Sequence, residues 1–332
     1  MTRRNSNPIV AMSLMTSCIV ASAQGLDGMQ GRSCGTPEPP LAEVVGATRE
    51  ARPFLESSAR FRVSRVKVTI PVAVHVIHNN GAGNVPESLI DKQLFVLNQV
   101  LGPVGFEFTK HSVTRTNNAA WYRMISGDRT EADAKRGLAV DHTQVLNMYI
   151  AKPRGWTEDS AGAPVLEELL GFATFPWWLE TQEFDPKLDG VVLDHESLPD
   201  ARAWQFDLGY TAIHEVGHWL GLLHTFHGGG ANASDSRNGC QDPGDEVADT
   251  PFEFGPNRGP GYRKECPMSV RSVCPTGGLN PIHNFMNYSD DKCMTELTPG
   301  QDYRALNMTQ RYRSEFVDRS PSVVKFRATF GR

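Results

Sequence analysis

The residues most able to do chemistry lie in one short run, TAIHEVGHWLGLLHTFHGGG, at positions 211–230. It places His214, Glu215 and His218 in the pattern H-E-x-x-H. On a helix, residues four apart project from one face about one turn apart, so both imidazoles can reach one ion. The pattern therefore predicts two zinc ligands with a carboxylate beside them that can act on a water molecule.

The motif continues with Gly221 and His224, each three residues further along. The added glycine and histidine make a chance match rare. Gly221 can take the positive φ that ends a helix, which lets His224 approach the ion from another direction. Three neutral imidazoles leave a fourth position for water, as at a catalytic zinc. The competing interpretation is buried histidines that satisfy core hydrogen bonds. We expect His227, beyond the motif, to be solvated.

The elements predicted around the motif indicate an α/β domain. Apolar and β-branched runs predict strands within 66–83, 105–113, 144–151, 171–178 and 189–195, and helical spacing predicts a helix within 85–102 and a partly helical segment at 128–140. The motif lies on a further helix. From about 228 to 293 the chain is rich in Gly, Pro, Asn and Asp, which predicts loops.

The chain has 332 residues, which is long enough for one large domain or two smaller ones. Its formal net charge is -5. Nucleic-acid binders usually carry a basic patch or stripe, and the sequence has no Lys/Arg cluster of that kind. We therefore expect no nucleic-acid partner.

The first residues predict export. Arg3 and Arg4 precede an apolar stretch at 8–20 and the small residues Ala-Ser-Ala at 21–23, which together are typical of a secretory signal covering 1–23. A lipoprotein anchor at Cys18 is the alternative. No other run reaches the roughly 18 apolar residues that a spanning helix needs, so we expect a secreted chain without a membrane span.

The cysteines fit an oxidising compartment. Beyond the predicted signal, Cys34 stands alone, and four others cluster late in the chain at Cys240, Cys266, Cys274 and Cys293. Their spacing is not the paired C-x-x-C of a structural zinc site, so we expect two disulfides. The spacing leaves all three pairings open.

At this point the chain resembles a known group. HEVGHWLGLLH resembles the extended zinc signature of metzincin metalloproteases, and HNFMNYSDDKC supplies a candidate Met-turn at Met286. Within the metzincins the chain is similar to the pappalysins, in particular to their short secreted cytophagalysin branch, over about residues 66–315. This similarity rests on IPVAVHVIH, LNMYIA, LGFATFP, GVVLD, GDEVADTP, NFMNYSDDKC and LTPGQ.

The resemblance implies a fold and a domain order. It implies a mixed α/β architecture with a twisted, mostly parallel sheet, an antiparallel edge strand, an active-site helix and a backing helix. We expect a signal peptide at 1–23, a pro-segment at 24–65, an N-terminal subdomain at 66–224 with the zinc helix, and a loop-rich C-terminal subdomain at 225–332.

The resemblance also implies an activity, which is zinc-dependent hydrolysis of peptide bonds in protein or peptide substrates by a monomer. Glu215 would be the general base, and Tyr288 would steady the reaction intermediate. Met286 would lie beneath the zinc. The implied disulfides are Cys240–Cys274 and Cys266–Cys293.

Two further sites follow from the resemblance. Asp245, Asp249 and the Thr250 carbonyl imply a calcium site, for which a solvated acidic turn is the alternative. GRSCGTPEPP resembles pro-segments whose cysteine occupies the fourth zinc position, which would make Cys34 the ligand that keeps a zymogen silent. The alternative is an unpaired cysteine. Basic residues at Arg60, Arg62 and Arg65 offer sites for its removal.

Specificity and rival functions remain open at this stage. We expect an extended substrate to bind along the strand GFATFP. Asp290 and Asp291, which precede Lys292, offer an acidic group that is compatible with a preference for a basic side chain after the scissile bond. One rival is a secreted zinc-binding or adhesive module that has lost catalysis. Another is a different metzincin family such as the astacins.

Overall fold

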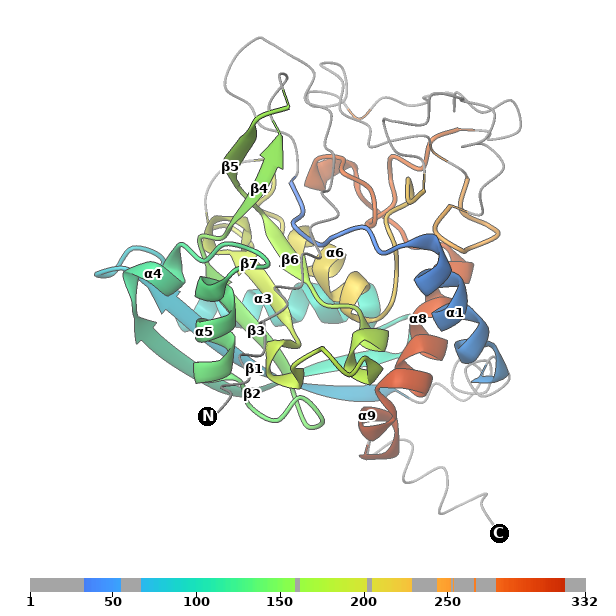
Figure 1. The fold of residues 1–332 in the computed structure, drawn as a ribbon, viewed down its shortest axis with the longest axis horizontal. Coiled ribbons are helices and arrows are strands. Elements are labelled where there is room, and N and C mark those ends of the chain that lie inside the picture. The colour runs from blue at the N-terminus through green and yellow to red at the C-terminus, as the bar shows by residue number, and fades with distance from the viewer. Residues whose placement is uncertain are drawn as a thin grey trace, which may run out of the picture.

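The computed structural model describes residues 33–54, 67–158, 162–201, 205–228, 244–251, 253, 266 and 279–319. Its centre is a five-stranded sheet in the order β2-β1-β3-β7-β6 (Figure 1). Four strands are parallel, β2 (Phe106–Asn117), β1 (Val68–His78), β3 (Leu146–Ala151) and β7 (Val191–Asp194). At the edge, β6 (Gly171–Ala173) pairs antiparallel with β7. The predicted mixed sheet with an antiparallel edge strand is confirmed.

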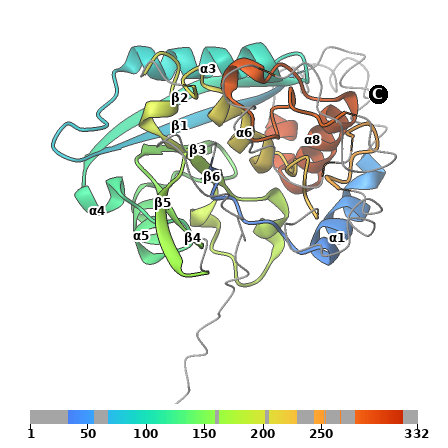
Figure 2. The same ribbon diagram turned by 90° about the horizontal axis from the view of Figure 1, so that it is seen from above.

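Helices cover both faces of this sheet (Figure 2). One face carries α3 (Glu87–Leu101) and α6 (Tyr210–Trp219), and the other carries α4 (Ala119–Tyr122) and α5 (Arg129–Leu138). The apolar run of β1 reflects this, because Val72 and Val74 pack with α3 and α6 while Ile77 packs with Ala134 of α5. A parallel strand buried on both faces has little polar alternation.

Residues 171–178 do not form the single strand that we predicted. Strand β6 ends at Ala173, and a 3-10 helix, η2 (Pro176–Glu180), follows. Pro176 has no N–H for a strand ladder and suits the first helical position. A hairpin of β4 (Arg154–Glu158) and β5 (Pro164–Glu168), absent from the sequence prediction, projects beside β6 (Figure 1).

A buried ion pair joins the late helices to the sheet. Arg313 lies between α8 (Pro299–Tyr312) and α9 (Ser314–Arg319), and its guanidinium donates two hydrogen bonds of 2.9 and 2.8 Å to Asp189. Trp219, at the end of α6, donates its indole N–H to the same carboxylate at 3.0 Å. Arg313 also donates to the carbonyl of Trp219. The pair thereby fixes the C-terminal end of α6.

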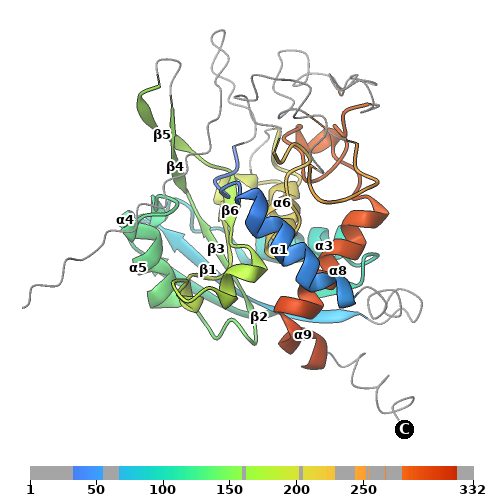
Figure 3. The same cartoon turned by 45° about the vertical axis from the view of Figure 1, so that its right-hand side comes forward.

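The predicted pro-segment contains a helix, α1 (Leu41–Ala51), which ends in the short turn η1 (Arg52–Phe54) and lies beside α8 (Figure 3). The remaining short helical turns are η3 (Pro186–Leu188), η4 (His195–Ser197) and η5 (Asp291–Cys293). A disulfide joins Cys266 to Cys293. The other implied pair, Cys240 and Cys274, and the predicted signal at 1–23 lie outside the described residues. Among the described helices, none has the length and apolarity to cross a bilayer.

Candidate metal centre

The helix α6 carries the first half of the motif, and two local features set its ends. Asp291 accepts hydrogen bonds from the backbone N–H groups of Leu208 (2.9 Å) and Tyr210 (3.4 Å) at its start. After its last turn, Gly221 has φ +94°, and a Cβ there would lie 2.7 Å from Met308. Only glycine fits such a position. The predicted helix-ending glycine is confirmed, and it turns the chain toward His224.

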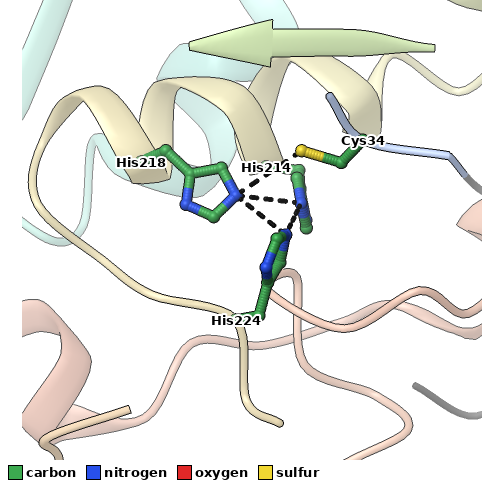
Figure 4. Close-up of side chains that lie close together, drawn as sticks. All are labelled: Cys34, His214, His218 and His224. Atoms are coloured by element: carbon green, nitrogen blue, oxygen red, sulfur yellow. Dashed lines mark hydrogen bonds between the residues drawn. The ribbon is translucent and has the colours of Figure 1, made fainter. Parts of the chain in front are cut away.

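Three imidazoles meet at this turn (Figure 4). The Nε2 atoms of His214, His218 and His224 are 3.1 to 3.2 Å from one another. All three side chains are buried. The structure therefore brings together the three histidines that the sequence singled out.

In two of the rings, the opposite nitrogen fixes the position of the proton. Nδ1 of His214 donates to the Phe285 carbonyl and Nδ1 of His218 donates to the Leu222 carbonyl, both at 2.8 Å. A carbonyl can only accept, so each Nδ1 carries the proton and each Nε2 presents a lone pair. Burial, the largest cause, lowers the pKa of His218 well below its ordinary value. Its ring is thus neutral, the form that binds a metal.

These nitrogen atoms fit a tetrahedral cation. Buried lone pairs that face one another without a donor are costly unless a positive charge lies between them. Three nitrogens ~2.0–2.1 Å from a tetrahedral zinc ion would lie roughly 3.3–3.4 Å apart, close to the observed 3.1–3.2 Å. Within the described residues, the group of His, Cys, Asp and Glu side chains suited to an ion is Cys34 with these three histidines.

Glu215 lies between the histidines and the edge strand. It is buried, and a Cβ on Gly171 of β6 would come within 2.8 Å of its Cγ. Gly171 therefore leaves the space that the carboxylate occupies. In this position Glu215 lies beside both the candidate metal and any chain that pairs with β6.

Met286 and Tyr288 also lie at the centre. Met286 is fully buried beneath α6, where a Cβ on Gly217 would lie 2.5 Å from its sulfur. The Tyr288 ring centroid is 4.9 Å from that of His224 and 5.8 Å from that of His214. Asn287, between them, donates to buried Glu253 at 2.6 Å. Sequence reasoning did not single out Asn287 and Glu253, which hold this turn in place.

Segment 33–54 enters the same centre. The Cys34 sulfur is 3.8 Å from Nε2 of His218 (Figure 4). It donates to Glu215 at 3.5 Å, and the Thr36 hydroxyl donates to the same carboxylate at 3.0 Å. Burial, and then the charge of Glu215, raise the pKa of the Cys34 thiol well above its ordinary value. A coordinated cation acts in the opposite sense, because it deprotonates a thiol.

The segment also pairs with the edge strand. Gly35 donates its N–H to the Gly171 carbonyl at 2.9 Å, and the Leu170 N–H donates to the Ser33 carbonyl at 2.9 Å. This parallel bridge occupies the strand that we predicted as the substrate's pairing edge. A substrate pairing with Gly171 would have to displace the segment.

The prediction that His227 is solvated is wrong. Its side chain is 3 % exposed, and its Nδ1 donates to Glu38 of segment 33–54. The other carboxylate oxygen of Glu38 accepts from Nδ1 of His224 at 2.5 Å. Burial opposes a charge on Glu38, but its interactions with His224 and His227, which donate hydrogen bonds to it, bring its pKa well below its ordinary value. An anionic Glu38 therefore holds both rings.

The acidic loop that suggested calcium contacts α8. Asp249 accepts from the Thr298 hydroxyl at 2.7 Å and from the Gly300 N–H at 2.9 Å, at the start of that helix. Asp245 accepts from Gln301 at 3.2 Å, and burial raises its pKa to about 7. These protein donors engage both carboxylates, and calcium with Thr250 stays a prediction of the resemblance.

Comparison with known proteins places the chain in a family. Residues 170–310 match the peptidase family model described as pregnancy-associated plasma protein-A. An extracellular metalloprotease of Colletotrichum graminicola is 35% identical over 311 residues, which are 92% of this chain and 98% of the relative. Extracellular metalloprotease 1 of Coccidioides posadasii is 32% identical over 314 residues, which are 94% of this chain and 99% of the relative.

The chain belongs to the pappalysin family.

Solved structures agree with this assignment. Promirolysin of Tannerella forsythia, in a mutant form, is 25% identical with a TM-score of 0.63, covering 86% of this chain and 97% of its own. Mature mirolysin of the same organism, solved with a cleaved peptide, is 26% identical with a TM-score of 0.57, covering 78% and 97%. This pappalysin is thus a metzincin-type metalloendopeptidase, a metal-dependent hydrolase of peptide bonds.

Proposed function

We propose that this chain is a secreted, zinc-dependent endopeptidase that is made as a zymogen. The observation that carries the proposal is the convergence of three buried Nε2 atoms, 3.1–3.2 Å apart, beside the carboxylate of Glu215. Export is supported by the predicted signal at 1–23 and by the extracellular relatives. Zinc is supported by an all-imidazole donor set that leaves a fourth position.

Each residue of the centre has its own role in the proposed reaction. A zinc ion held by His214, His218 and His224 would supply Lewis-acid polarisation of the scissile carbonyl and acidify a water molecule. Glu215 takes a proton from the attacking water and later delivers it to the leaving amine. Tyr288, whose ring lies beside His224, donates a hydrogen bond to the oxygen that becomes negative. The substrate backbone pairs with β6, which places its carbonyl near Glu215.

Metal content tests the proposal directly. Elemental analysis of the purified secreted protein is expected to find about one zinc per chain, and casein cleavage after removal of the pro-segment is expected to depend on it. Casein cleavage by protein from which every transition metal is absent would contradict the assignment. A chain that binds zinc and cleaves nothing would favour the non-catalytic module instead.

The zymogen part rests on the contacts of Cys34. Its sulfur lies beside the three histidine nitrogens, in the group of atoms that could hold an ion. Cys34 and Thr36 both donate hydrogen bonds to the Glu215 carboxylate. Cys34→Ala is expected to raise peptidase activity of the uncut chain by about tenfold or more, because a thiolate ligand no longer competes with water. Activity is measured on chains that mass spectrometry shows to be intact. Ser33→Ala, which changes a neighbour outside the cluster, serves as the control. Equal activity of both variants would refute the role of the thiol.

Asp290 is our candidate for the group that selects a basic side chain after the scissile bond. Asp291 accepts a hydrogen bond from the backbone at the start of α6, and the side chain of Lys292 is exposed. Asp290 is buried, and it follows Tyr288 by two residues in the sequence. Asp290→Asn is expected to lower the preference for arginine over leucine by about 10- to 100-fold in kcat/KM. Peptide pairs differing at that residue measure it, with Asp318→Asn as an exposed control. An unchanged ratio would exclude Asp290.

A further inference from the structure

Helix α1 is held on the catalytic domain by a surface of its own, which touches the metal centre through Phe175, whose ring centroid is 5.4 Å from that of His218. We call this the α1-binding surface, and its residues are Phe175, Trp177, Trp178, Leu223, Met308 and Tyr312. Val44, Ala47 and Ala51 of α1 are buried against it, whereas Leu41 and Val45 on the other side of the helix are about half exposed. The helix is therefore docked along one face, as an amphipathic ligand would be.

Polar contacts fix the docked helix at several points. Glu43 accepts hydrogen bonds from the indole N–H groups of Trp177 (2.6 Å) and Trp178 (2.8 Å). Further along, Arg311 donates to Glu50 at 2.8 Å and Arg304 donates to the Thr48 hydroxyl at 2.8 Å. The acidic side chains of α1 thus face indole N–H donors and an arginine of the domain. The α1-binding surface therefore complements the helix in charge as well as in shape.

The same segment has a second anchor at the metal centre. Cys34 and Thr36 contact Glu215, and Glu38 holds His224 and His227. Only Pro39 and Pro40 separate this anchor from α1. A short link of two prolines has few conformations to lose on binding. While one anchor is bound, the link also keeps the other anchor close to its own binding site, at a high effective concentration.

In both anchors, the residues that the pro-segment contributes lie before residue 55. The basic residues that are candidates for cleavage lie after it, at Arg60, Arg62 and Arg65. We propose that, after a cut within 55–66, the segment 33–54 stays bound through both anchors as a separate chain and keeps the enzyme inhibited until it is degraded or diluted away. This inference rests on the proposed peptidase function. It makes activation a two-step process, in which cleavage alone is not sufficient.

The test uses the full chain with a recognition sequence for a specific protease placed within 55–66. After cutting, gel filtration with mass spectrometry is expected to find the fragment that contains 33–54 eluting with the enzyme, and casein cleavage is expected to stay within about twofold of the uncut protein. Val44→Ser removes buried methyl groups and buries a hydroxyl, so the cut variant is expected to lose its fragment and gain at least about tenfold in activity. Val45→Ser, the same change on the exposed side of α1, is the matched control.

Two results would overturn the inference. One is a wild-type fragment that separates as soon as the chain is cut. The other is equal behaviour of Val44→Ser and Val45→Ser. With Cys34→Ala, the cut fragment is still expected to elute with the enzyme, because α1 remains docked; its immediate loss would show that the helix is no anchor. Co-elution does not depend on activity, so a failure of the proposed peptidase function would appear separately, as fragment release without casein cleavage.

Discussion

Glu215→Gln is expected to lower kcat for peptide hydrolysis by about 10²- to 10⁴-fold, the usual contribution of a general acid–base. The amide keeps the size of the carboxylate beside Gly171 but cannot take the proton of water. The histidine rings are held by other groups, two of them by the carbonyls of Phe285 and Leu222. Zinc content and thermal stability should therefore stay close to those of the parent protein.

The measurement uses protein from which segment 33–54 has been removed, so that the proposed inhibition by this segment does not mask the effect. Glu315→Gln, an exposed change on α9, is the matched control and should retain full activity. If Glu215→Gln cleaves casein at the parent rate, another group must activate the water, and the mechanism given above fails. If it loses zinc as well as activity, the role of Glu215 is structural.

His218→Gln is expected to weaken zinc binding by on the order of 10²- to 10³-fold, because one of three ligands that share a binding free energy of ~10–16 kcal/mol is lost. Peptidase activity should fall with zinc occupancy. Its Nε2 lies 3.2 Å from that of His214 and 3.1 Å from that of His224, the atoms that would supply the other two ligands.

Zinc affinity is measured by competition with a chelator of known strength, alongside peptidase activity at matched zinc concentration. His111→Gln, at an exposed histidine of β2, should change neither quantity. Recovery of full activity in His218→Gln at saturating zinc would indicate a weakened but functional site. Unchanged zinc affinity would remove His218 from the ligand set.

The centre could be predicted from the sequence because its chemistry is local. His214, His218, Gly221 and His224 lie within eleven residues, and helix geometry with one positive-φ glycine nearly determines how they meet. Strand β1 and helix α3 were also predictable, since each has an uninterrupted apolar pattern.

Contacts between distant segments could not be predicted in this way. His227 lies in a polar, glycine-rich stretch, and only Glu38, 189 residues earlier, explains its burial. Residues 171–178 carry the composition of a strand, but Pro176 and the packing of Trp177 beneath α1 favour a 3-10 helix. Asp249 has the chemistry of a cation ligand, yet its position beside the first turn of α8 gives it backbone and hydroxyl donors.

The ion pair between Asp189 and Arg313 has a consequence for biosynthesis. Arg313 follows Asp189 by 124 residues and holds both that carboxylate and the end of α6. While the chain emerges from the ribosome or passes through a translocon, residues 33–54 therefore appear long before the helix bearing His214 and His218 has its final support. Under the proposed zymogen function, the inhibitory segment is thus made first and the fully braced protease last, which leaves a nascent chain little opportunity to cleave the proteins around it.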